Sequence, residues 1–118
     1  MFNFEKLDVW QKAIDFADLV YQCTRNFPTD ERFGLTNQMR RAAVSISSNI
    51  AEGISRMSQS DFRRFVEIVT GSVFEVISQG FVGRRQGFLT DEAFATLYSS
   101  AEEVGRMLSG LRRSLSAK

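Results

Sequence analysis

The sequence is poor in the residue types that most often build catalytic and metal-binding sites. It contains no His and a single Cys, Cys23. One Cys excludes a disulfide within the chain and a Cys-rich metal cluster, and the absence of His removes the commonest general base and metal ligand. We therefore expect no catalytic residue, no metal, no cofactor and no small-molecule substrate, and we interpret Cys23 as a structural helix residue.

Proline is also scarce, because Pro28 is the only one among the 118 residues. No low-complexity segment, linker or internal repeat divides the chain. With 43% hydrophobic and 25% charged residues, the composition is that of an ordinary globular domain. We expect one domain over residues 1–118.

The chain also lacks a strong excess of charge and a long apolar run. Its formal net charge is +1, so attraction to nucleic acid or to an anionic membrane requires local segregation of charge. The most apolar run, 42–51, contains three Ser and an Asn and is shorter than the ~18 residues needed to span a bilayer. Residues 1–6 include charges where a signal peptide is apolar. We expect a soluble, cytoplasmic protein without a membrane partner.

Apolar residues recur at alternating spacings of three and four along most of the chain, a pattern typical of amphipathic helices. They predict four helices at about 7–26, 31–55, 59–84 and 91–115. Phe27-Pro28 ends the first helix, and Thr29, Ser58 and Thr90 are predicted to cap the next three. Four helices with short connections favour an all-α, antiparallel up-down-up-down bundle. The alternative is a helical hairpin that completes its bundle only as a dimer.

The first helix carries two neighbouring apolar stripes rather than one. Leu7, Trp10, Ile14, Ala17, Tyr21 and Thr24 form an a/d stripe, and Val9, Ala13, Phe16 and Val20 lie beside it. Residues such as Phe74 and Phe81 also fall beside the core stripe of the third helix. This excess of apolar surface predicts a homo-oligomer. The candidate oligomer interface comprises Val9, Phe16, Val20, Arg40, Val44, Phe74 and Phe81.

The second helix combines a core face with a stripe of polar residues. The stripe contains Gln38, Arg41, Ser45, Ser48, Asn49 and Glu52. Three interpretations remain open: a network within the chain anchored by Arg41 and Glu52, a network between subunits, and a ligand site. Asn49 falls on a core position, where we expect a hydrogen bond to a neighbouring helix that fixes the register. Gly71 predicts that another helix passes close to the third.

In the predicted topology, basic residues gather at one end of the bundle. That end holds Lys6, Arg56, Arg63, Arg64, Arg112, Arg113 and Lys118, against the acids Glu5, Glu52 and Asp61. The other end is balanced. Five arginines, Arg56, Arg63, Arg64, Arg112 and Arg113, are therefore candidate contacts for RNA or DNA backbone phosphates. The alternative is that they complete helix ends and ion pairs.

Several strings in this chain are typical of one known family. The most specific is Ser45-Ile46-Ser47-Ser48-Asn49-Ile50-Ala51-Glu52-Gly53. It is accompanied by Phe4, Leu7, 9–13 (Val-Trp-Gln-Lys-Ala), Phe27-Pro28, Glu31, Leu35, Gln38, 40–43 (Arg-Arg-Ala-Ala), Arg56, Ser58, Phe62, Phe65 and Gly71-Ser72. On these residues the chain resembles the bacterial four-helix bundle family named after the 23S rRNA intervening-sequence protein, also called S23-like.

The resemblance implies an up-down-up-down bundle, commonly assembled as a ring-shaped homopentamer, without enzymatic activity and with an unsettled function. The accessory protein of diversity-generating retroelements looks similar and binds nucleic acid. We therefore expect a non-enzymatic homo-oligomer that binds RNA or DNA backbone through its Arg-rich end. The alternative is a protein-interaction scaffold or adaptor without nucleic acid. The chain departs from the family at 77–87, where Gly80, Gly83 and Gly87 predict a weakened end of the third helix.

Overall fold

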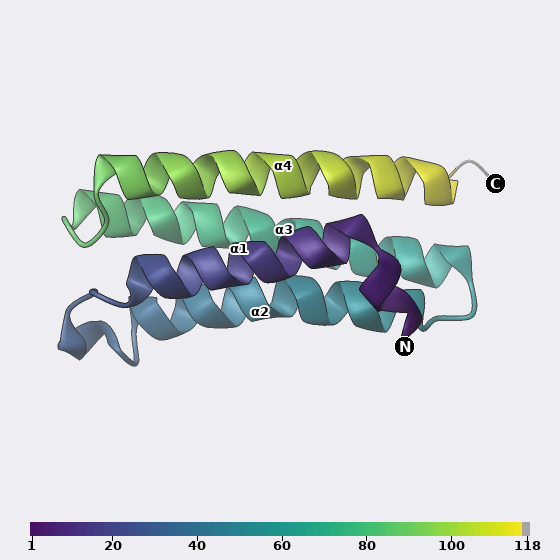
Figure 1. Cartoon of the computed structure of the whole chain (residues 1–118), viewed down its shortest axis with the longest axis horizontal. Helices are drawn as coiled ribbons and strands as arrows, with labels where there is room; N and C mark the ends of the chain where they lie inside the picture. Colours follow the sequence, from purple (N-terminus) through teal and green to yellow (C-terminus); the bar gives the residue numbers. More distant parts are fainter. Residues whose placement is uncertain (117–118) are drawn as a thin grey trace.

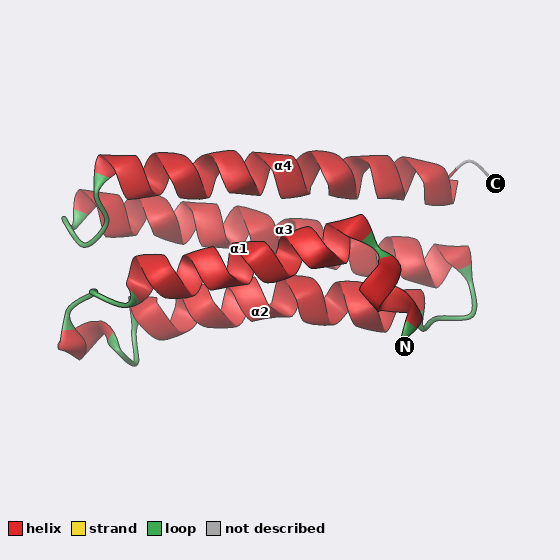
Figure 2. Cartoon of the chain, in the orientation of Figure 1, coloured by secondary structure: helices red, strands yellow, loops and turns green. Residues whose placement is uncertain are grey.

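Four long helices lie side by side and antiparallel in the computed structural model, which describes residues 1–116 (Figure 1). They are α1 (Asp8–Thr24), α2 (Leu35–Ile54), α3 (Gln59–Arg85) and α4 (Asp91–Ser116), with short 3₁₀ helices η1 (Asn3–Lys6) and η2 (Thr29–Glu31). Within the described residues every regular element is helical (Figure 2). α1 packs on α2 and α4, and α3 packs on the same two helices. The prediction of an all-helical four-helix bundle is confirmed.

Two of the predicted helix caps are present. The Oγ atom of Ser58 accepts a hydrogen bond from the Asp61 amide at 3.0 Å, and the Oγ1 atom of Thr90 accepts one from the Ala93 amide at 3.0 Å. Each bond satisfies an amide that has no partner inside its own helix. These bonds explain why the predicted starts of α3 and α4 agree with the structure.

The predicted start of α2 was wrong. Thr29 opens the 3₁₀ turn η2 and caps nothing with its side chain, and α2 begins at Leu35 rather than near residue 31. Gly34, with φ −108° and ψ −116°, takes the backbone out of the helical path. The carboxylate of Glu31 reaches across this break, and its Oε1 atom accepts a hydrogen bond from the Leu35 amide at 3.0 Å. Glu31 therefore does the capping that was assigned to Thr29.

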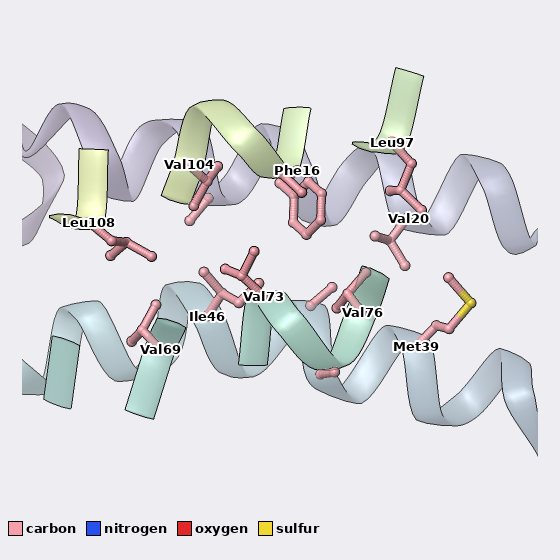
Figure 3. Packing of buried hydrophobic residues seen from close by; sticks show 14 of the residues in the cluster. Phe16, Val20, Met39, Ile46, Val69, Val73, Val76, Leu97, Val104 and Leu108 are labelled. Carbon is pink, nitrogen blue, oxygen red and sulfur yellow. The ribbon is translucent and has the colours of Figure 1, made fainter. Parts of the chain in front are cut away.

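The core runs along the bundle axis and is filled from all four helices (Figure 3). Its largest fully buried side chains include Phe16, Met39, Ile46, Leu97 and Leu108. The α1 stripe that faces this core is Val9, Ala13, Phe16 and Val20, whereas most of the first stripe is only half-buried. The two stripes lie next to each other on the helix, so their spacing alone does not decide which one points inward.

The assignment of Val9, Phe16 and Val20 to an oligomer interface is therefore corrected. Val9 is 6% exposed, and Phe16 and Val20 are 0% exposed, within a single chain. Their apolar area is already buried against the other three helices. It contributes to the stability of the bundle and adds nothing to a surface that another subunit could cover.

The glycines near the end of α3 do not interrupt it, since the helix continues to Arg85. Gly80 and Gly83 are buried. A Cβ atom on Gly80 would lie 3.2 Å from the Cε1 atom of Phe94 in α4, so the missing side chain permits close packing. Gly87 has φ +78°, a conformation that favours glycine, and it lies in the turn that leads to α4.

The close helix contact expected at Gly71 is also corrected. No heavy atom of another element lies within 4 Å of a Cβ atom built on Gly71. The tight approach occurs at Gly53, where an added Cβ would lie 2.8 Å from the Cβ atom of Phe65 in α3. The Gly that ends the specific string at 45–53 is thus the one that lets α2 and α3 approach each other.

Among the described residues one helix, α3, is long and apolar enough to cross a membrane by length and composition alone, with a mean hydropathy of 1.4 in its most apolar stretch. Core helices of water-soluble bundles pass the same test. α3 buries its Val66, Val69, Val73 and Val76 stripe against the other helices. This stripe places α3 in the core of the bundle.

Candidate nucleic-acid interface

One end of the bundle collects the basic residues that the sequence placed there. The N-terminus, the α2–α3 loop and the C-terminal end of α4 all lie at this end, on the right in Figure 1. Arg56 lies in the loop, Arg63 and Arg64 in the first turns of α3, and Arg112 and Arg113 in the last turns of α4. We call these five residues the Arg-rich end. Lys118, predicted beside them, lies outside the described residues.

Two of the five arginines are already neutralised by acids. The Nη2 atom of Arg112 lies 2.6 Å from the Oε2 atom of Glu67 in α3, and its Nε atom donates to the same oxygen at 2.9 Å. Arg56 pairs with Glu52 at 2.8 Å and lies over the ring of Phe65. All four ionic side chains are about half exposed, so these pairs are screened by water. The ion-pair alternative therefore holds for Arg56 and Arg112.

The other three arginines carry the surplus charge of this end. Within residues 1–116, Arg63, Arg64 and Arg113 form no ion pair. Arg63 donates from Nη1 to the Ser116 hydroxyl at 3.4 Å, which is a contact with a neutral group. These guanidinium groups remain available to an anion from outside the chain.

A shallow hollow of about 290 Å³ lies between the start of α3 and the end of α4. Its lining residues are Ser60, Arg63, Arg64, Glu67, Arg112 and Ser116. Three guanidinium groups and two hydroxyls face one carboxylate, so hydrogen-bond donors dominate. The start of α3 adds the positive end of one helix dipole and the end of α4 the negative end of another, so the positive charge of the hollow comes from its side chains. This arrangement suits a phosphate group.

The opposite end of the bundle carries acids and arginines in equal number. Arg84 lies over the rings of Phe81 and Phe94, with its guanidinium carbon 5.3 and 4.4 Å from their centroids. Asp91 and Glu92 follow in the first turn of α4. The acids and arginines near this turn are balanced in number, as the sequence predicted, and this turn offers no basic cluster comparable to the Arg-rich end.

The polar stripe of α2 is divided between solvent and contacts inside the chain. Gln38, Arg41, Ser48 and Glu52 are exposed, and Ser45 and Asn49 are half-buried. The Ser45 hydroxyl donates to the Ser72 hydroxyl of α3 at 2.8 Å. Asn49 donates from Nδ2 to the Ser45 carbonyl of its own helix at 2.8 Å. The bond between helices that was expected from Asn49 is therefore made by Ser45.

Four residues of the predicted oligomer interface remain outside the core. Phe74 is 73% exposed, Val44 42% and Phe81 41%. Arg40 is held against α1, because its Nε atom donates to the Thr24 hydroxyl at 2.9 Å. Phe74 is therefore the member with the most apolar surface to offer.

An apolar groove of about 270 Å³ runs between α3 and α4 beside Phe74. It is lined by Val73, Phe74, Ile77, Tyr98, Ala101, Glu102 and Gly105. Tyr98, which the sequence analysis missed, joins Phe81 and Phe94 in one aromatic cluster, with centroids 4.7 to 6.4 Å apart. Tyr98 directly follows the core residue Leu97, and an aromatic residue at the edge of the core stripe of α4 was the sequence feature that could have indicated it.

The described residues contain no group of three His, Cys, Asp or Glu side chains that could hold a metal ion. Burial raises the pKa of the Cys23 thiol. A raised pKa lowers the fraction of thiolate, which is the nucleophilic form. Cys23 therefore has the properties of a packed helix residue.

Comparison with known proteins identifies the family. A solved structure with TM-score 0.80 is described as a protein with unknown function from the S23 ribosomal protein family of Bacteroides thetaiotaomicron. It shares 21% sequence identity, covering 87% of this chain and 96% of that one, and at this identity it shows a common fold. No curated protein matches the chain. The family description "23S rRNA-intervening sequence protein" matches residues 5–110, so the chain belongs to the 23S rRNA-intervening sequence protein family.

Proposed function

We propose that this protein is a non-enzymatic homo-oligomer, a pentameric ring by resemblance, that binds the phosphate backbone of RNA or DNA through its Arg-rich end in the cytoplasm. The observation that carries the proposal is the hollow between α3 and α4. There Arg63 and Arg64 meet Arg112 beside two Ser hydroxyls, and neither Arg63 nor Arg64 has an acidic partner within residues 1–116.

The chemistry of guanidinium groups favours this ligand. Arg donates several N–H groups in a fixed plane and binds phosphate oxygens in pairs. Such contacts release condensed counterions, so affinity falls steeply with salt and depends little on base sequence. Arg64 and Arg113 are exposed and therefore reachable by a bulky polyanion. Oligomerisation would repeat the Arg-rich end once in every subunit and multiply a weak contact.

The exposed apolar surface on α3 and α4 supports oligomerisation. Phe74 projects beside the groove that contains Ile77 and Tyr98, and it is 73% exposed in the single chain. Covering an aromatic residue of this size contributes roughly 1.5–3 kcal/mol for each side chain. We expect Phe74→Glu to shift the protein toward monomer in light scattering, whereas Met57→Glu, at a fully exposed loop position, should leave its mass unchanged.

The binding proposal is tested with the charge-reversal variant Arg63→Glu, Arg64→Glu. Retention of labelled duplex RNA by the wild-type protein should fall as salt is raised, and the double variant should abolish it. Arg25→Glu, Arg85→Glu, at two exposed positions of the opposite end, is the matched control and should retain most binding. Retention that is unaffected by salt and by reversal at Arg63 and Arg64 would contradict the proposal.

A protein-interaction scaffold or adaptor is the second candidate, and the apolar groove beside Phe74 is the observation that favours it. A partner segment with an apolar helix face could cover Phe74, Ile77 and Tyr98 without any nucleic acid. Co-purification of one defined protein after RNase and DNase treatment, lost in Phe74→Glu but kept in Arg63→Glu, would favour this reading over the first.

A further inference from the structure

A second basic surface lies on the side of the bundle, away from the Arg-rich end. It is an open hollow of about 600 Å³ where the first half of α2 meets α1 and the turn before α2. The residues that matter in its lining are Tyr21, Arg32, Phe33, Asn37, Arg40 and Arg41. No acidic residue lines it. We call it the side hollow.

The side hollow is positively charged and therefore attracts anions. Within the described residues, Arg32, Arg40 and Arg41 form no ion pair. Three like charges around one hollow repel one another, and a bound anion would relieve this repulsion. The chain itself provides no such anion, so the partner must come from elsewhere.

Arg40 is held in position before any ligand arrives. Its guanidinium carbon lies 4.5 Å from the centroid of the Tyr21 ring, and its Nε atom donates to the Thr24 hydroxyl at 2.9 Å. The Thr24 hydroxyl is fixed in turn, because it donates to the Val20 carbonyl at 2.8 Å. The Nη2 atom of Arg40 also donates to the Tyr21 carbonyl at 3.5 Å, and the N–H groups of Nη1 are left for a ligand of the hollow that Arg40 lines. A donor fixed in this way loses little conformational freedom on binding.

Phe33 supplies a feature that a simple anion site does not need. Its side chain is 82% exposed, although it belongs to a short turn beside the core. The guanidinium carbon of Arg32 lies 5.0 Å from the ring centroid and covers one side of the ring. The other side is open to a flat group. An exposed aromatic ring among arginines is the arrangement by which proteins stack bases of single-stranded nucleic acid.

We propose that the side hollow binds a single-stranded segment of RNA or DNA, with one base stacked on Phe33 and backbone phosphates at Arg40 and Arg41. A duplex cannot use Phe33 in this way, because its bases are already stacked inside the helix. An acidic peptide would use the arginines but not the ring. The side hollow and the Arg-rich end share no residue, so this inference goes beyond the proposed function and does not depend on it.

The stacking contact is tested by fluorescence anisotropy with a labelled oligouridylate of about ten nucleotides and a duplex of the same length. Phe33→Ala should raise the Kd for the single strand at least about fivefold, the lower bound for loss of one stacked base, and leave the Kd for the duplex unchanged. Phe33→Trp, which keeps an aromatic ring, should bind the single strand as tightly as the wild type. Phe2→Ala removes another exposed Phe, at 71% exposure and outside both the side hollow and the candidate oligomer interface; it is the matched control, with no expected change in Kd.

The phosphate contacts are tested by the salt dependence of the same single strand. Arg41→Ala should reduce the slope of log K against log salt by about 0.7, the value for one phosphate contact on a single strand. Arg85→Ala, an exposed Arg at the same end of the bundle, should leave the slope unchanged. An equal effect of both variants would overturn the assignment of Arg41.

The outcomes separate this inference from the proposal for the Arg-rich end. Loss of single-strand binding in Arg63→Glu, Arg64→Glu, with no effect of Phe33→Ala, would overturn the side hollow alone. Loss of single-strand binding in Phe33→Ala, with duplex binding unchanged, would support the side hollow as the binding site. If Phe33→Ala changes the oligomeric mass but not the Kd, a second copy of the chain covers the hollow. If polyglutamate displaces the single strand equally well from the wild type and from Phe33→Ala, the ligand of the hollow is an acidic peptide. Either result would overturn the inference.

Discussion

Replacement of Gly53 by Ala should destabilise the bundle, because the added methyl group has no room. Its Cβ atom would lie 2.8 Å from the Cβ atom of Phe65 and 3.1 Å from the Cδ1 atom of Phe62. The nearest atom, the Cβ of Phe65, is attached directly to the α3 backbone and cannot rotate away, so α2 and α3 must separate locally. Overpacking of this kind costs about 1–3 kcal/mol. The gain in helix propensity is at most about 1 kcal/mol, and it is smaller here because Gly53 is the next-to-last residue of α2.

Gly71→Ala is the matched comparison. Nothing lies within 4 Å of the added Cβ, and Gly71 lies inside α3. Only the gain in helix propensity remains, so the free energy of unfolding of this variant should rise by up to about 1 kcal/mol. The free energies of unfolding of the two variants should therefore differ by at least about 1 kcal/mol, in opposite directions from wild type.

Both variants are measured by urea unfolding followed by far-UV circular dichroism. Protein concentration must be the same throughout, since an oligomer gains stability with concentration. If Gly53→Ala is as stable as Gly71→Ala, the close approach of α2 and α3 at Gly53 is refuted. A change in the denaturant slope rather than in the midpoint would point to an altered unfolded or native ensemble instead.

Four further predictions have defined outcomes. Phe16→Ala, at a side chain that is 0% exposed, should cost about 3–5 kcal/mol in urea unfolding, and a loss below 1 kcal/mol would contradict its place in the core. Thr90→Ala should cost about 1 kcal/mol through the lost cap of α4, while Thr90→Ser should behave as wild type. Arg112→Ala should cost no more than about 1 kcal/mol, because its pair with Glu67 is half exposed, and the difference should vanish in high salt. Cys23 should react more slowly with a disulfide reagent in the native protein than in urea at about pH 8, because burial raises its pKa; equal rates would show that the thiol is accessible.

The number and direction of the helices could be predicted because each depends on local signals. Apolar spacing marks the helical faces, and short polar segments such as Ser58-Gln59 and Thr90-Asp91 mark the starts of α3 and α4 through side chains that bond within three residues. The start of α2 could not be predicted in this way. The Glu31 carboxylate bonds to the Leu35 amide only after Gly34 has turned the chain, and that backbone conformation is decided by packing.

The face of α1 that points toward the core was the other feature that could not be predicted from the sequence. Two adjacent stripes fit the same spacing, and the structure chooses the one with Val9, Phe16 and Val20 because α2, α3 and α4 leave a space of that shape. The candidate sites show the same division. The arginines of the bundle end could be placed from topology alone, but which of them have acidic partners depends on side chains far apart in the chain, such as Arg112 and Glu67.

The unequal lengths of the helices have a consequence for motion. α3 has 27 residues and α4 has 26, against 17 in α1, a difference of about 15 Å at 1.5 Å per residue. α3 and α4 therefore reach beyond α1 at both ends of the bundle, and at the Arg-rich end their outermost turns also pass the end of α2 (Figure 1). With neighbours on fewer sides, the backbone amides of these turns should exchange with solvent faster than those of the central turns. Four of the arginines of the Arg-rich end lie in these turns, where the Arg112–Glu67 pair and the contact between Arg63 and Ser116 already join α3 to α4. A phosphate bound there would add a further link between the two helix ends, so ligand binding would be coupled to local helix order.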